Sequence, residues 1–140
     1  MFIALLKDGT GVAALGRDVG RRWREAVPSW RQARVVLFGE AARILTLAVC
    51  DWAGVALSDA AAADLARDCT SMVDGFATPG PRHLRARRAR HRQEEALADL
   101  IKTVRETQEA DRTSSALQTV AWHRDPDGNL LPRTPPPLSC

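Results

Sequence analysis

The sequence contains no tyrosine and few other aromatic residues, with four tryptophans and three phenylalanines among 140 residues. It also lacks a long apolar run. The apolar stretch Ile44–Cys50 is far shorter than the ~20 residues that a helical membrane span needs. The first residues lack the basic lead and the small-residue cleavage site of a secretory signal. We therefore expect neither secretion nor a membrane span, and no membrane among the partners.

Cysteine is scarce and widely spaced, at Cys50, Cys69 and Cys140. No CxxC pattern and no Cys/His ligand spacing occurs, and His83 and His91 lie among arginines that would repel a cation. The GxSxG nucleophile motif and the glycine–lysine phosphate loop are also absent. These absences argue against a protein-only metal site and a hydrolytic nucleophile. An odd number of irregularly spaced thiols favours a reducing, cytoplasmic setting.

What the sequence does have is helical periodicity, which predicts an all-α chain that is short enough for one domain. A proline, a glycine or a capping serine marks most of the expected boundaries. The spacing predicts helices from Thr10 or Gly11 to Pro28, over Glu40–Leu57, over Asp59–Phe76 after the N-cap Ser58, over about Arg82–Glu109, and after Ser114 or Ser115. A short extended piece is expected at Ala33–Phe38, and a turn at Asp125–Gly128.

The expected helix Glu40–Leu57 has apolar residues around most of its circumference rather than along one stripe. A helix of this kind is normally buried on every side, which a few other helices cannot achieve. Met1–Leu6 is apolar and uncapped, as the tail of an earlier helix would be. Both features indicate missing structure. A noncatalytic interaction module that docks Glu40–Leu57 on a partner is another interpretation.

The net charge of +3 arises from one segment. Six arginines fall within the eleven residues Arg82–Arg92, and without this segment the chain would carry a net charge of −3. A row of arginines on a helix can neutralise several phosphates, which makes a small basic nucleic-acid-binding protein an alternative function. The sequence has no aromatic interleaving, zinc frame or helix-turn-helix to accompany the row, so nucleic acid is not the favoured partner.

Several short motifs occur together and in order along the chain. They are Arg22-Trp23, Trp30, Val35–Ala41, Ile44-Leu45, Asp51–Val55, Met72–Phe76, Gly80–His83, Arg87–Arg90, Ala116-Leu117, Ala121–His123 and Asp127-Gly128. In this combination the chain resembles the bacterial fatty-acid peroxygenases, the peroxide-using branch of the heme-thiolate cytochrome P-450 superfamily. The resemblance covers about Phe2–Leu131.

The resemblance implies that residues 1–131 form a partial cytochrome P-450 domain from the front and middle of a longer helical enzyme. The proline-rich tail, residues 132–140, departs from the family and is predicted to be disordered, as a frameshift or gene remnant would produce. The family uses heme b with a cysteine thiolate, takes a fatty acid and hydrogen peroxide, and needs no redox partner. Its products are hydroxylated fatty acids or terminal alkenes.

Few functional residues carry over. The glycine-rich loop with the ligand cysteine and the arginine–proline pair of the central helix are absent, and neither Cys140 nor Arg133 matches them. We therefore assign no catalytic, heme-binding or metal-ligating residue, and expect this chain alone to be inactive. Only Val73 and Phe76 match substrate-channel positions of the family. Ordinary core packing at helical spacing explains these two residues equally well.

Overall fold

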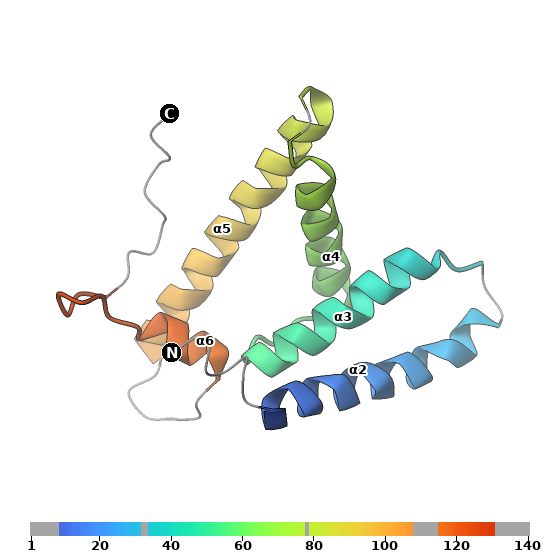
Figure 1. Cartoon of the computed structure of the whole chain (residues 1–140), viewed down its shortest axis with the longest axis horizontal. Helices are drawn as coiled ribbons and strands as arrows, with labels where there is room; N and C mark the ends of the chain where they lie inside the picture. The colour runs from blue at the N-terminus through green and yellow to red at the C-terminus, as the bar shows by residue number, and fades with distance from the viewer. Residues whose placement is uncertain (1–8, 32–33, 78, 108–114, 131–140) are drawn as a thin grey trace. The chain divides into compact units, whose positions relative to one another are not determined.

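The computed structural model describes residues 9–31, 34–77, 79–107 and 115–130. In these ranges the chain forms five α-helices and no β-strand (Figure 1). The helices are α2 (Gly9–Trp30), α3 (Leu37–Ala53), α4 (Asp59–Asp74), α5 (Pro81–Thr107) and α6 (Ala116–Ala121). The all-α prediction is confirmed for the described residues. The proline-rich tail 132–140 and the segment Met1–Leu6 lie outside them.

Several expected boundaries were wrong. Helix α3 ends at Ala53 rather than Leu57, because Gly54 takes a left-handed φ of 85° and stops it, and α4 ends at Asp74 rather than Phe76. Helix α2 continues past Pro28 to Trp30, because proline has a helical φ and its ring removes only one backbone donor close to the helix end. The predicted extended piece at Ala33–Phe38 is too long, since Leu37 and Phe38 already belong to α3. Extended backbone is found just before the helix, where Val36 has φ −90° and ψ 100°.

Other boundaries agree with the capping signals. The Ser58 hydroxyl accepts a hydrogen bond from the Ala61 amide at 3.2 Å, and the Ser115 hydroxyl accepts one from the Gln118 amide at the same distance. Each serine thereby satisfies an amide that the first turn of its helix leaves free. The turn at Asp125–Gly128 is also confirmed, with the Gly128 amide donating to the Asp125 carbonyl at 3.0 Å.

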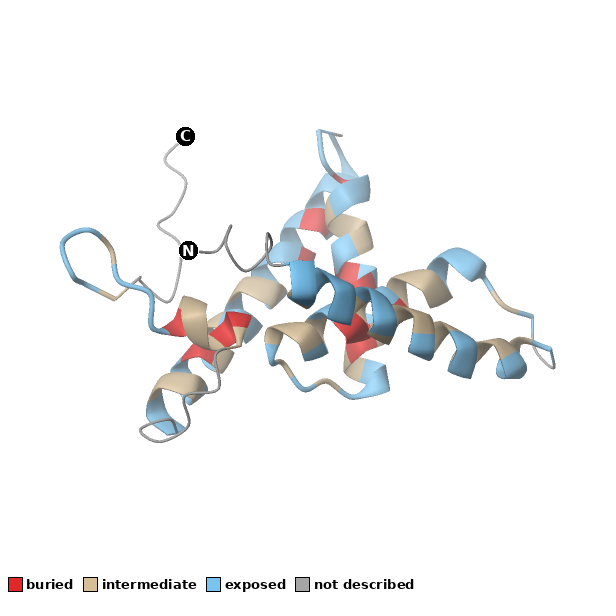
Figure 2. Cartoon of the chain, turned by 60° about the horizontal axis from the view of Figure 1, so that its bottom comes forward, coloured by how far each residue is buried: buried red, intermediate tan, exposed pale blue. Residues whose placement is uncertain are grey.

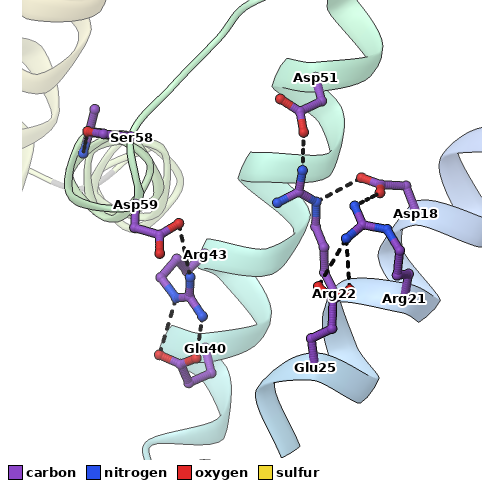
Figure 3. Close-up of polar contacts among 10 residues, drawn as sticks. Asp18, Arg21, Arg22, Glu25, Glu40, Arg43, Asp51, Ser58 and Asp59 are labelled. Carbon is purple, nitrogen blue, oxygen red and sulfur yellow. Dashed lines mark hydrogen bonds and ion pairs between the residues drawn. The ribbon is translucent and has the colours of Figure 1, made fainter.

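The chain divides into two compact units after Thr70. In the first unit α2 packs against α3, and an ion pair between Arg22 and Asp51 joins the two helices (Figure 3). The Arg22 guanidinium donates through Nε to Asp18 one turn earlier at 2.8 Å, and through its other end to Asp51 of α3. Arg43 of α3 contacts Glu40 at 2.9 Å and Asp59, the first residue of α4, at 3.7 Å. These arginines connect elements that are separate in sequence.

The core of the first unit is small. Its buried apolar side chains come from α3 and the first part of α4: Ile44, Leu47, Ala48, Ala62 and Ala66. The described residues of α2 are exposed or half-buried (Figure 2). Its two tryptophans, Trp23 and Trp30, pack edge to face with ring centroids 5.2 Å apart. Alanine buries little apolar area, so this core contributes modest hydrophobic stabilisation.

Large apolar side chains of α3 remain exposed. Leu45 and Val49 are about half exposed, and Leu37 and Phe38 are more exposed still. The expectation that this helix is apolar on all sides is therefore confirmed, and in the described part of the chain only one side of it is covered. Exposed apolar area of this extent is typical of a surface that another structure covers.

The second unit contains the end of α4 together with α5 and α6. Gly75, just after α4, lies so close to α5 that a Cβ added to it would be 2.4 Å from the Ala86 Cβ and 2.8 Å from the Arg82 carbonyl oxygen. At the other end of α5, helix α6 buries Ala116, Leu117 and Ala121, and Arg105 Nε donates to the Ala121 carbonyl oxygen at 2.8 Å. Small residues thus set both close contacts of α5.

Acid should destabilise the first unit. Hydrogen bonds from Arg22 and Arg21 lower the pKa of Asp18 below 3.8, and one from Arg43 lowers that of Glu40 below 4.5. A depressed carboxyl pKa stabilises the folded state above the unfolded-state pKa, and this stabilisation disappears as pH falls through the folded-state pKa. We expect the free energy of unfolding, measured with urea, to fall as pH drops from 5 through about 4 to 3.

The double variant Asp18→Asn/Glu40→Gln should show a weaker pH dependence over the same range. Asp99→Asn, which neutralises an exposed carboxylate of α5, serves as the control and should keep the wild-type dependence. If the free energy of unfolding changed equally with pH in the double variant and the wild type, these two ion pairs would not stabilise the fold.

The close approach at Gly75 gives a second prediction. Gly75→Ala should destabilise the chain by about 1–3 kcal/mol, because the added methyl group overpacks against Ala86 and the backbone. Gly16→Ala is the matched control, since nothing lies within 4 Å of its Cβ position in α2. It should stabilise the chain by up to about 1 kcal/mol through helix propensity. Thermal unfolding followed by circular dichroism measures both, and the same sign for both variants would contradict the close contact.

Candidate functional site

The two predicted channel residues lie together where α4 ends. Val73 is in the last turn of α4, and Phe76 is in the turn that follows it. The Phe76 amide donates to the Val73 carbonyl oxygen at 3.2 Å, which fixes their spacing. Their exposed fractions are 76% and 81%, so neither belongs to the core of the described residues. Their role in a channel stays a prediction.

The backbone of this turn determines that Phe76 is exposed. Gly75 packs on Ala86 and Arg82 of α5, and Ala77 next to Phe76 has a left-handed φ of 57°. Left-handed backbone is uncommon for a residue with a Cβ, and it reverses the chain direction here. Gly80, with φ 98°, makes the second reversal before α5 begins. The turn is thus anchored through Gly75 while the Phe76 ring remains free to contact another surface.

Two surface depressions lie beside this turn. One, of about 700 Å³, is lined by Pro79, Pro81, Arg82 and Arg85. The other, of about 290 Å³, is lined by Ser71, Asp74 and the same two arginines. Neither includes Val73 or Phe76, and neither is an enclosed apolar cavity of the kind that buries most of a ligand. Neither depression therefore provides a closed channel for an acyl chain.

The thiols of the described residues do not fit a heme-thiolate ligand. Burial raises the pKa of Cys50, with a further contribution from the Asp51 carboxylate, and raises that of Cys69, next to Asp68. A cysteine that ligates iron must be deprotonated, and reactive thiolates occur where positive charge lowers the pKa. No group of three or more His, Cys, Asp or Glu residues in the described ranges is arranged to hold a metal. Cys140 lies outside these ranges.

The arginine run forms the first half of α5, as expected. Arg90 Nε donates to Glu94 at 2.6 Å, and His91 Nε2 lies 3.4 Å from Glu95, so acidic residues one turn later lie close to the end of the run. Beyond the arginines themselves, no described feature supports nucleic-acid binding. In the described ranges no helix is both long and apolar enough to cross a membrane.

Sequence reasoning missed the two depressions and the close approach at Gly75. The sequence carried a partial signal for the close approach, because a glycine follows α4 and alanines recur at Ala86 and Ala89 of α5. Small residues at such positions permit close helix contact. Whether Gly75 meets Ala86 still depends on the direction that the chain takes after the turn, and residue spacing alone does not predict that direction.

Searches with protein-family models found no match to this chain. Solved structures do match it. The structure of cytochrome P450SP alpha (CYP152B1) in complex with (R)-ibuprophen has 35% sequence identity and a TM-score of 0.81, over 91% of this chain and 32% of that one. Cytochrome P450EX alpha (CYP152N1), wild-type with myristic acid, has 27% identity and a TM-score of 0.79, over 94% of this chain and 31% of that one.

These matches confirm the resemblance that the motifs indicated. The chain carries a partial cytochrome P-450 fold, and the structures to which it is similar are fatty-acid peroxygenases of the CYP152 group. It spans about a third of the length of those proteins.

The pKa directions of the thiols predict their reactivity. In a Cys140→Ser background, iodoacetamide should modify Cys50 and Cys69 more slowly at neutral pH in the folded chain than in urea, because a raised pKa leaves less thiolate. Mass spectrometry of each peptide over time measures the two rates separately. A modification rate that is higher in the folded chain than in urea at either cysteine would indicate an activated thiolate. That cysteine would then be a candidate ligand for heme iron.

Proposed function

We propose that this chain, with its partial cytochrome P-450 fold, supplies one wall of the substrate channel of a fatty-acid peroxygenase and is inactive alone. The observation that carries the proposal is the match over 91% of the chain at 35% identity, in a structure with a bound carboxylic acid. The second match has a fatty acid bound, which agrees with a substrate that has a long apolar chain and a carboxylate.

Val73 and Phe76 are the residues that we assign to the channel. Both are apolar, both are largely exposed in this chain, and a backbone hydrogen bond links them across the anchored turn at Gly75. Covering a large apolar side chain contributes about 1.5–3 kcal/mol relative to leaving it in water. An acyl chain, or the remaining part of the enzyme, would provide that cover. These residues then select the substrate by shape and apolar contact and take no part in proton or electron transfer.

The remaining parts of the activity belong to the same proposal. In the complete enzyme we expect heme iron, hydrogen peroxide as oxidant, no redox partner and a cytoplasmic location. Heme with a thiolate ligand would supply O–O bond cleavage. The described residues of this chain fit no ligand of that group, so the chemistry falls to segments outside the part described. This chain contributes binding and exclusion of water.

The first test uses the purified chain. Titration with hemin in the presence of myristic acid and hydrogen peroxide should give neither a thiolate-type Soret band nor hydroxylated or decarboxylated product. Cys50→Ser and Cys69→Ser should leave the hemin titration unchanged, because desolvation and a neighbouring carboxylate raise the pKa of each thiol and disfavour its thiolate. A thiolate-type spectrum together with product formation would contradict the proposal.

The second test places the chain in a complete enzyme. We would replace the matching segment of cytochrome P450SP alpha with residues 9–130 of this chain, and measure heme content and peroxide-dependent turnover of myristic acid. The chimera should bind heme and turn over. In it, Phe76→Ala should raise the Kd for myristic acid about tenfold, the loss expected from roughly two buried methylene equivalents.

Leu97→Ala in the same chimera is the control, because Leu97 is a half-exposed apolar residue of α5 away from the turn. It should leave the Kd for myristic acid unchanged. Equal effects of the two alanine variants would remove Phe76 from the channel, and a chimera that folds without heme would contradict the peroxygenase assignment.

A further inference from the structure

The first half of α5 carries an unusual concentration of positive charge. The segment from Pro79 to Arg92 contains six arginines and no acidic residue. Most of these side chains are exposed. Like charges one turn apart on a helix repel one another, so this arrangement destabilises the free helix unless anions are close by.

The middle arginines of the run have no acidic partner in the part of the chain that the structure describes. Arg85, Arg87 and Arg88 make no ion pair there, whereas Arg90 in the next turn pairs with Glu94 at 2.6 Å. The arginines of α5 therefore fall into two groups, with and without an acidic partner on the helix. Arg90 is neutralised within α5, and the three arginines before it present their charge to the solvent.

An apolar residue lies among these arginines. The helix turns by about 100° per residue, so Leu84 and Arg88 share a face, with Arg85 and Arg87 on its two sides. Leu84 is 54% exposed, while Ala86 and Ala89 on the other side of α5 are buried. We call Leu84, Arg85, Arg87 and Arg88 the basic face. It combines fixed positive charge with an exposed apolar side chain.

We propose that the basic face of α5 binds the surface of membranes that contain anionic lipid. Basic side chains near an anionic membrane are attracted within roughly a Debye length, about 8 Å at physiological ionic strength. A leucine between arginines can enter the boundary between headgroups and acyl chains while the guanidinium groups stay with the phosphates. Such binding is peripheral and needs no membrane-spanning helix.

The exposed side chain of Leu84 favours a lipid surface over nucleic acid as the partner of the basic face. A phosphate backbone would neutralise the arginines and leave Leu84 in water, whereas a lipid surface takes both kinds of side chain. The neighbouring Pro79 and Pro81 are exposed as well and add no acidic group. Val73 and Phe76 are not part of this face, so the inference stands independently of the proposed substrate channel.

The test is sedimentation of the full 140-residue chain with phosphatidylcholine vesicles that contain or lack phosphatidylglycerol. We expect binding to the anionic vesicles only, weakening as salt is added. The triple variant Arg85→Gln/Arg87→Gln/Arg88→Gln should lower the partition coefficient tenfold or more. Each arginine near an anionic surface adds to the binding free energy, and the variant removes three of these contributions.

The matched control is Arg17→Gln/Arg24→Gln/Arg31→Gln, which removes three exposed arginines from the first unit and gives the same net charge of zero. It should retain most of the binding. Leu84→Ser should weaken binding without a change in charge, and Leu97→Ser should not. Circular dichroism of each variant reports whether helix content is preserved.

Three results would overturn the proposal. Equal loss in the two triple variants would show a response to net charge rather than to this face. Equal binding to vesicles with and without phosphatidylglycerol would remove the electrostatic basis. Tighter, Arg85-dependent binding to duplex DNA than to anionic vesicles, unaffected by Leu84→Ser, would identify the face as a nucleic-acid surface.

Discussion

Helix α3 has apolar side chains around its circumference, and the described part of the chain covers only one side of it. Ile44 and Ala48 are buried, while Leu45 and Val49 on other sides are about half exposed. Burial of apolar area is the main favourable term in folding, so a central helix that is half covered leaves part of that free energy unused. The other features follow from this constraint, because the alanine-rich core of the first unit cannot replace the missing contacts. In the second unit, Val73 and Phe76 at the end of α4 are likewise apolar and exposed.

Ion pairs also connect the helices of the first unit, where apolar packing is limited. Arg22 connects Asp18 of α2 with Asp51 of α3, and Arg43 connects Glu40 with Asp59 (Figure 3). Ion pairs that are partly exposed contribute little individually, and they depend on pH and salt. The arginines of the basic face differ in kind, since no ion pair joins Arg85, Arg87 or Arg88 to a carboxylate within the described ranges, although Asp74 lines a depression beside Arg85. Paired arginines thus join elements within the chain, and unpaired ones leave charge for an external anion.

Local signals in the sequence predicted the helices well where a cap or a breaker was present. Ser58 and Ser115 cap α4 and α6 as their positions suggested, and α5 begins directly after the Gly80 reversal. The prediction failed at Pro28 and at Leu37, where tolerance of proline near a helix end and packing of α2 on α3 outweighed local preference. The pair Asp18–Arg22 could be expected from spacing, but its contact with Asp51 could not, because it depends on how α2 and α3 pack. Val73 and Phe76 were reached through family resemblance, since periodicity alone equally fits core residues.

We infer that the apolar sides of α3 need cover from the rest of a cytochrome P-450 fold. Hydrogen exchange measures this directly, by comparing the amides of Leu45, Val49 and their neighbours in the isolated chain with those in the chimera with cytochrome P450SP alpha. Amides of a helix that opens easily exchange fast, and burial raises the free energy of opening. We expect α3 to exchange at least tenfold more slowly in the chimera. Equal protection of α3 in both proteins would show that the chain is complete without that cover, and would contradict the account.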